Sequence, residues 1–145
     1  MKIPFGDLKR QYEQLRPIID QVTQEVYDSG WFILGKQVQQ FEANFAQYCS
    51  AKYAVGVGSG TEALHLALIA CGVNPGDEVI TVSNTCVPTL SAISFAGAIP
   101  IFVDLNEEDY NISPQLIERR ITEKTKAILP VHLYGQCADM DAIIN

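Results

Sequence analysis

The sequence GVGSGTEALHLAL at residues 56–68 decides the fold. It continues an apolar run from Tyr53 to Val57, which predicts a strand, and its apolar residues then recur at helical spacing as far as Cys71. Glycines permit a sharp turn and a close approach of a ligand to the backbone. The first helical turn leaves N–H groups unpaired at the positive end of the helix dipole, where anions such as phosphate bind. The stretch therefore predicts a strand, a tight turn and a helix from Thr61 that holds a phosphate group at its N-terminus.

The residues after Cys71 repeat a strand-and-helix pattern with short connections. Apolar runs of strand length alternate with runs of helical spacing, and turn signals rich in glycine and proline separate them. This order is typical of an α/β fold with a mostly parallel sheet and helices on both faces. The pattern predicts strands at residues 78–82, 99–103 and 126–131, and helices at 87–95, 114–121 and from Asp139 or Asp141 onward.

The first fifty residues carry no strand pattern and predict an N-terminal arm with two helices. Pro17 favours a helix start, so we expect helices at about 17–27 and 37–48. Between them, residues 31–34 are four large apolar side chains, which either pack in a core or face a partner or ligand. We therefore expect an N-terminal helical part at residues 1–50 and the start of an α/β domain at residues 51–145.

Polar or turn residues follow each predicted strand. Ligands of open parallel sheets bind beyond the carboxyl ends of the strands, because the loops meet there. We therefore expect four segments to converge on one crevice: Gly58 to Thr61, Ser83 to Cys86, Asp104, and His132 to Gly135.

The composition excludes several kinds of partner. The chain has 145 residues and a formal net charge of −7, which argues against binding to nucleic acid or to an anionic membrane surface. No run approaches the roughly 18 apolar residues of a membrane span, and Met1 to Asp7 lacks the apolar core of a signal peptide. The four cysteines have no metal-ligand or CxxC spacing. We therefore expect a soluble protein of the reducing cytoplasm without a bound metal.

The glycine-rich turn does not fit the common nucleotide-binding motifs. A P-loop needs GxxxxGK[ST], which does not occur, and the glycines at 56, 58 and 60 have the wrong spacing for a dinucleotide fingerprint. ATP and dinucleotides are therefore disfavoured as ligands. A structural turn that binds nothing remains an alternative.

The wider sequence is more specific than this turn. It contains, in order, IPFGDLKRQY, SGWFILGKQVQQFE, SGTEALHLAL, GVNPGDEVITVSNTCVPTLSAI, GAIPIFVDL and TKAILPVHLYGQCADMDAI. These segments resemble the fold-type I pyridoxal-phosphate enzymes and, among them, the DegT/DnrJ/EryC1/StrS family of sugar aminotransferases. The resemblance extends over all 145 residues.

The resemblance implies a site for pyridoxal 5′-phosphate. Gly60 and Thr61 would hold the cofactor phosphate through backbone N–H groups and the Thr61 hydroxyl, and Glu62 would add its N–H. Asn84 and Cys86 lie where the family places a residue over the face of the pyridine ring. Many members have an aromatic residue there, so stacking would be weaker in this chain. A buried spacer is the alternative role for Cys86.

The resemblance also implies residues that line the crevice or an interface. His132 and Tyr134 would line the crevice, although a packed histidine is the alternative for His132. Trp31 and Phe32 would lie near the dimer interface and the mouth of the active site. His65, inside the helix that follows the turn, is expected to be structural.

The resemblance implies a function that these residues alone do not complete. The family needs a lysine that forms a Schiff base and an aspartate that pairs the pyridine nitrogen, and both are expected beyond Asn145. We therefore expect the N-terminal part of a homodimeric aminotransferase that acts on a keto-sugar nucleotide in cell-surface polysaccharide biosynthesis, with glutamate as amino donor. The chain alone should be inactive. Alternatives are a sugar dehydratase that uses the same cofactor and a non-catalytic regulatory protein of the same fold.

Overall fold

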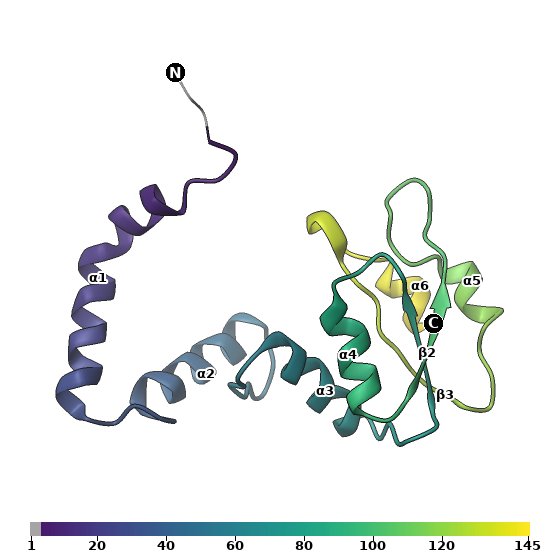
Figure 1. Cartoon of the computed structure of the whole chain (residues 1–145), viewed down its shortest axis with the longest axis horizontal. Coiled ribbons are helices and arrows are strands. Elements are labelled where there is room, and N and C mark those ends of the chain that lie inside the picture. The colour runs from purple at the N-terminus through teal and green to yellow at the C-terminus, as the bar shows by residue number, and fades with distance from the viewer. Residues whose placement is uncertain (1–3) are drawn as a thin grey trace. The chain divides into compact units, whose positions relative to one another are not determined.

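The computed structural model describes residues 4–145, and the chain divides into two compact units, Met1–Gly56 and Val57–Asn145. Each unit is described by itself (Figure 1). The sequence predicts a boundary after residue 50, six residues before the division between the units. That domain assignment stays a prediction.

The first unit contains two helices, α1 (Leu8–Ser29) and α2 (Lys36–Tyr48). The expected start of the first helix at Pro17 is wrong, because Pro17 lies inside α1. Asp7 caps the helix instead: its Oδ1 accepts the N–H of Arg10 at 3.0 Å. A capping carboxylate at the helix N-terminus satisfies an otherwise unpaired donor, so the helix begins there. The helix ends at Gly30, whose φ of 64° is left-handed.

The second unit contains a three-stranded parallel sheet with the order β2-β1-β3. Its strands are β1 (Glu78–Val82), β2 (Ile99–Val103) and β3 (Thr125–Ile128). The bounds of β1 and β2 are those predicted from the sequence, whereas β3 is shorter. β1 is central, and its residues from Val79 to Val82 are buried on both faces.

β2 forms one edge of the sheet and carries a proline. The N–H of Ile99 donates to the carbonyl of Asp77 at the start of β1, at 2.8 Å. Because N–H groups alternate in direction along a strand, the nitrogen of Pro100 faces away from β1. Pro100 therefore stands at the outer edge, where it removes no hydrogen bond from the sheet.

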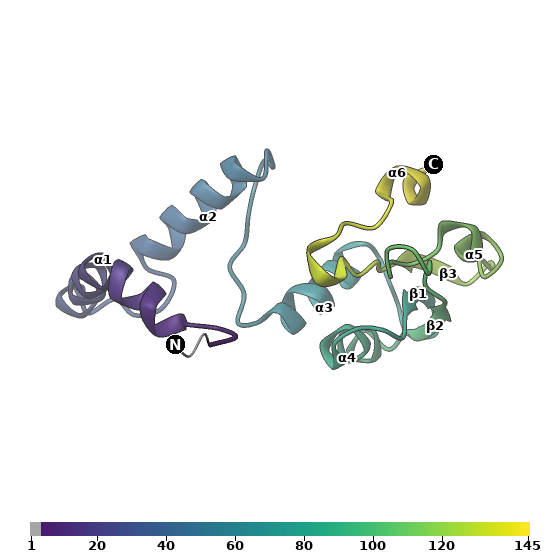
Figure 2. The same ribbon diagram turned by 90° about the horizontal axis from the view of Figure 1, so that it is seen from above.

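Helices cover both faces of the sheet, which confirms the predicted fold class (Figure 2). One face carries α3 (Gly60–Ala70) and α4 (Val87–Phe95), and the other carries α5 (Pro114–Glu118) and α6 (Met140–Ile144). A short 3₁₀ helix, η1 (Leu133–Gly135), follows β3. The core beneath α3 and α4 consists of Leu68, Val73, Val79, Ala92, Ile93, Ala96 and Ala98. The core of the opposite face consists of Ile80, Val82, Val103, Ile112, Ile117 and Ala138.

The predicted strand at residues 53–57 does not form, and the prediction is wrong for this structure. The segment belongs to no sheet among residues 4–145. Tyr53 and Val55 are 74% and 78% exposed. A strand requires a neighbour that pairs its N–H and C=O groups. The N–H of Gly56 donates instead to Glu42 Oε1 at 2.7 Å, within the first unit.

Candidate functional site

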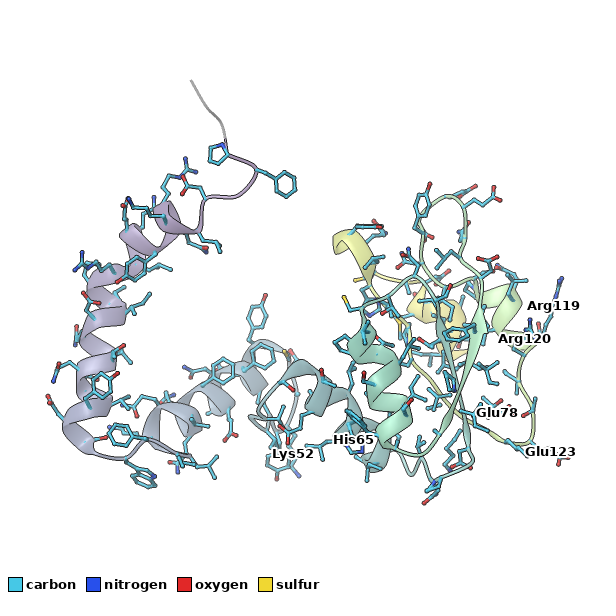
Figure 3. All side chains as sticks on the ribbon, viewed as in Figure 1. Lys52, His65, Glu78, Arg119, Arg120 and Glu123 are labelled. Carbon is cyan, nitrogen blue, oxygen red and sulfur yellow. The ribbon has the colours of Figure 1, made fainter. Side chains whose placement is uncertain are left out.

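α3 packs against α4 and leads through a short turn into β1. The turn of residues 71–77 joins the end of α3 to the start of β1, and in it Val73 N–H donates to the Leu68 carbonyl at 3.1 Å. His65 lies on α3 (Figure 3), and its ring meets that of Phe95 on α4 with 6.0 Å between the ring centroids. α3 therefore packs against α4 and is joined to β1 by a short turn.

Residues 58–62, which we call the cradle loop, form a reciprocal cap at this helix N-terminus. Ser59 is the N-cap residue, and its Oγ accepts the N–H of Glu62 at 3.1 Å. The carboxylate of Glu62 turns back, and its Oε2 accepts the N–H of Gly58 at 2.6 Å. The pattern is a variant of the capping box, in which the glutamate accepts the N–H of Gly58, the residue before the N-cap, instead of the N–H of Ser59 itself. The S-x-x-E motif is visible in the sequence, although no cap was predicted from it.

The cradle loop leaves a place for an anion at Gly60 and Thr61. Within residues 4–145, neither N–H group has a hydrogen-bond acceptor, and neither does the Thr61 hydroxyl. A Cβ built on Gly60 would meet no heavy atom within 4 Å. The space above this residue is open, and donors at the positive end of the helix dipole face it. The loop therefore fits the phosphate group of pyridoxal phosphate. The N–H of Glu62, also predicted to bind it, already donates to Ser59.

The loop after β1 leads directly into α4. Thr85 and Thr89 share a hydrogen bond of 2.7 Å between their hydroxyl groups, which ties the loop to the first turn of α4. Cys86 is the N-cap residue of α4 and its thiol is exposed and free. Among residues 4–145, Cys86 is therefore not buried, and its role as a spacer or a cofactor contact stays a prediction. Asn84 is half-buried in the same loop. Whether Asn84 and Cys86 contact a cofactor stays a prediction.

The loop after β3 holds its histidine by a backbone hydrogen bond. His132 Nδ1 accepts the N–H of Ala138 at 3.0 Å. Because Nδ1 acts as the acceptor, the neutral ring carries its proton on Nε2. Tyr134, two residues later, has a φ of 57° and is 80% exposed. Non-glycine residues seldom adopt this conformation, and the ring of Tyr134 stands in solvent. β1 and β3 are adjacent and parallel, so this loop lies at the same edge as Asn84.

A cleft at the carboxyl ends of β1 and β2 brings two more predicted segments together. Ser83, Asp104 and Arg120 line it with Phe102 and Val103, and its volume is about 290 Å³. Of the four segments predicted to converge on one crevice, the loops after β1 and β2 line this cleft, whereas Gly58 to Thr61 and His132 to Gly135 do not. Arg120 was not predicted for this region, because it follows α5 rather than a strand.

Trp31 and Phe32 belong to the first unit. They are 57% and 63% exposed, and Phe32 lies against Tyr27 with 6.1 Å between ring centroids. In the described part of the first unit, Trp31 and Phe32 are therefore not packed in a core. Their expected place near an interface and an active-site mouth stays a prediction. Across residues 4–145, no helix is long and apolar enough to span a membrane.

Comparison with known proteins identifies a family. The DegT/DnrJ/EryC1/StrS aminotransferase family matches residues 14–145. A "Pleiotropic regulatory protein" of Geobacillus stearothermophilus is 53% identical over 143 residues, which are 99% of this chain and 38% of that protein. The dTDP-3-amino-3,4,6-trideoxy-alpha-D-glucose transaminase of Streptomyces venezuelae is 49% identical over 142 residues, which are 98% of this chain and 38% of that protein.

Two solved structures also resemble the chain. S. venezuelae DesV in complex with a ketimine intermediate superimposes with a TM-score of 0.95 and 48% identity, over 99% of this chain and 38% of that one. The structure of ntda from Bacillus subtilis with bound cofactor PMP gives a TM-score of 0.90 and 40% identity, over 98% of this chain and 33% of that one. The chain thus spans 33–38% of the length of these relatives.

Proposed function

Because this chain belongs to the DegT/DnrJ/EryC1/StrS aminotransferase family, we propose that it forms the phosphate-binding part of an aminotransferase for keto-sugar nucleotides. The family uses pyridoxal 5′-phosphate, and the proposed amino donor is glutamate. The chain spans 38% of the transaminase that it resembles at 49% identity. The activity is therefore proposed for a longer protein that contains this chain.

The observation that carries the proposal is the open N-terminus of α3. The N–H groups of Gly60 and Thr61 have no acceptor among residues 4–145, and the space at Gly60 is open. Gly60 and Thr61 are the first two residues of α3, and the first N–H groups of a helix have no acceptor within the helix, so an anion can satisfy them. Membership of a family that uses pyridoxal 5′-phosphate favours a phosphate here over a turn that binds nothing.

The chain's own residues bind and orient the cofactor. Gly60 and Thr61 would hold the phosphate through backbone N–H groups, and the Thr61 hydroxyl would add a third donor. Asn84 and Cys86, on the loop after β1, would contact the ring. When bound, the cofactor carries the amino group between donor and acceptor and supplies the electron sink that side chains lack. His132 and Tyr134, on the loop after β3, would contact the substrate.

The reactive lysine is proposed to lie outside this chain. The resemblance assigns no lysine of the sequence to the Schiff-base position, and Lys124 and Lys126 adjoin the start of β3, at the edge opposite the crevice. We place the lysine, and the aspartate that pairs the pyridine nitrogen, in the remainder of the longer protein. The lysines excluded by the resemblance are Lys2, Lys9, Lys36, Lys52, Lys124 and Lys126.

A second copy of the protein, rather than nucleic acid or a membrane, is the proposed macromolecular partner. Trp31 and Phe32 are exposed in the first unit, and we propose that they face this copy near the mouth of the active site. The proposed place of action is the cytoplasm, where the four free, exposed thiols would remain reduced. The proposed product serves cell-surface polysaccharide synthesis.

Two alternatives remain within the same family. A regulatory role is favoured by the relative of G. stearothermophilus, which is named as a regulatory protein and is 53% identical to this chain. A sugar dehydratase would use the same cofactor without transferring nitrogen. Because both alternatives retain the phosphate site, cofactor binding alone does not separate the three functions.

The test is isotope transfer by the full-length protein that contains this chain. We would supply ¹⁵N-glutamate, pyridoxal 5′-phosphate and a panel of keto-sugar nucleotides, and follow the sugar nucleotide by mass spectrometry. A gain of ¹⁵N supports the aminotransferase. Loss of water without ¹⁵N would support the dehydratase, and an unchanged panel with bound cofactor would support the regulatory role. Thr61→Val at reduced cofactor concentration serves as the control for dependence on the cradle loop.

A further inference from the structure

The carboxylate of Glu62 is held by a hydrogen bond from the backbone of Gly58. Its Oε2 lies 2.6 Å from the N of Gly58. A Cβ on Gly58 would lie 2.9 Å from this same oxygen, closer than non-bonded contacts allow. Gly58 has no positive φ, so its backbone conformation does not call for glycine. Because this oxygen is the free end of an exposed, flexible side chain, a Cβ on residue 58 would displace the Glu62 carboxylate from its hydrogen bond rather than disrupt the backbone.

The reciprocal cap decides which donors of the cradle loop stay open. The N–H of Gly58 is taken by the Glu62 carboxylate, and the N–H of Glu62 is taken by Ser59 Oγ at 3.1 Å. These two donors flank Gly60 and Thr61, whose N–H groups have no acceptor in the described part of the chain. Without the cap, the loop would lose the bond that fixes Gly58 and Ser59 before the helix. The cap therefore holds the loop in the form that leaves Gly60 and Thr61 free.

The negative charge of Glu62 gives a second reason why its carboxylate needs to be held in place. An acidic side chain in the first turn of a helix is attracted by the helix dipole, and so is the phosphate. A Glu62 side chain free to move would compete with a phosphate for the donors of Gly60 and Thr61. Held by Gly58, the carboxylate is kept away from these donors, on the N-terminal side of Ser59.

We propose that Glu62 is a positioning residue for the phosphate of the cofactor, acting through its carboxylate on Gly58 rather than through its own N–H. The proposal rests on the proposed function, since it needs a phosphate at Gly60 and Thr61.

A double-mutant cycle tests the coupling between the two residues. Affinities for inorganic phosphate and for pyridoxal 5′-phosphate would be measured for the unaltered protein, Glu62→Ala, Gly58→Ala and the double variant. We expect each single variant to bind about tenfold more weakly, as for the loss of one hydrogen bond to a charged group. The double variant should bind no more weakly than Glu62→Ala, because the added Cβ then meets no carboxylate.

Two further variants separate positioning from general loss of structure. Glu62→Gln keeps an acceptor oxygen and should restore most of the affinity, and the Gly58 amide resonance should keep its shift in ¹⁵N spectra. Glu123→Ala, an exposed acidic residue in the loop before β3 (Figure 3), should bind phosphate like the unaltered protein. Circular dichroism checks that every variant is folded.

The outcomes distinguish this inference from the proposed function. Undiminished binding by Glu62→Ala, or additive losses in the double variant, would overturn the positioning role while leaving the phosphate site intact. Absence of binding by the unaltered protein would overturn the proposed function, and the positioning role with it.

Discussion

Replacement of Gly60 by alanine separates what the fold needs from what a ligand needs. Gly60 is the first residue of α3, its φ is not positive, and a Cβ there would meet nothing within 4 Å. The protein itself therefore has no use for glycine at this position. Alanine exceeds glycine in helix propensity by up to about 1 kcal/mol in a helix interior, and less in the first turn. Gly60→Ala should leave the free energy of unfolding unchanged or raise it by a few tenths of a kcal/mol.

Cofactor binding should respond in the opposite direction. The N–H of Gly60 is one of the two open donors, and the added methyl group would stand in the space through which a phosphate oxygen reaches it. Loss of one hydrogen bond to a charged group costs about 1.5–3 kcal/mol. We therefore expect the affinity for pyridoxal 5′-phosphate to fall at least about tenfold. Urea denaturation without cofactor and a cofactor titration followed by absorbance would measure the two effects.

Gly97→Ala is the matched control. Gly97 has a φ of 71°, and a Cβ there would lie 3.0 Å from Cβ and Cγ of Pro75. This variant should lose about 1 kcal/mol or more of unfolding free energy while its folded fraction binds the cofactor normally. If Gly60→Ala bound the cofactor as well as the unaltered protein, the open space at Gly60 would not be the phosphate site. If it were strongly destabilised instead, the glycine would serve the turn alone.

Three other changes test separate parts of the structure. Thr61→Val should weaken binding of pyridoxal 5′-phosphate in titrations by about 1.5–3 kcal/mol, whereas Thr61→Ser should retain it; equal affinities would leave Thr61 no role beyond the helix. Thr81→Val should lower the unfolding free energy by about 1–2 kcal/mol, because the buried Thr81 hydroxyl donates to the Leu129 carbonyl at 2.9 Å; an unchanged urea midpoint would contradict this reading. Pyridoxal 5′-phosphate should slow alkylation of Cys86 and not of Cys71, as followed by mass spectrometry, since only Cys86 is placed at the crevice; equal protection would place the cofactor elsewhere.

The central strands were the most predictable part of the fold. β1 and β2 have the bounds expected from the sequence, because Val79 to Val82 are buried on both faces and turns containing Gly76 and Gly97 delimit the strands. Local signals of this kind need no knowledge of distant residues. The strand expected at Tyr53 to Val57 had the same apolar character but lacks a neighbour in the described structure. Sequence pattern reports the tendency of a segment, whereas a strand also requires a partner.

The candidate site was predictable where its geometry is local. Gly60 and Thr61 lie at a helix N-terminus, within one helical turn of the glycine-rich stretch that predicted it. The spacing of Ser59 and Glu62 is itself typical of a reciprocal cap. The bond between His132 and the Ala138 backbone depends on the path of a loop, which no periodicity encodes. The same holds for Arg120, which reaches the cleft beside Asp104 from a segment distant in sequence.

Pro100 in β2 makes the two edges of the sheet unequal in their ability to pair with a further strand. Its nitrogen faces outward and carries no hydrogen, so a foreign strand that approached this edge would find a donor missing at Pro100. The opposite edge differs: Leu129 N–H donates to Ile80 at 2.8 Å, so by alternation the N–H of Ile128 faces outward and can pair. Recruitment of a further strand, whether from the same polypeptide or from a neighbouring molecule during misassembly, is therefore favoured at β3 and discouraged at β2.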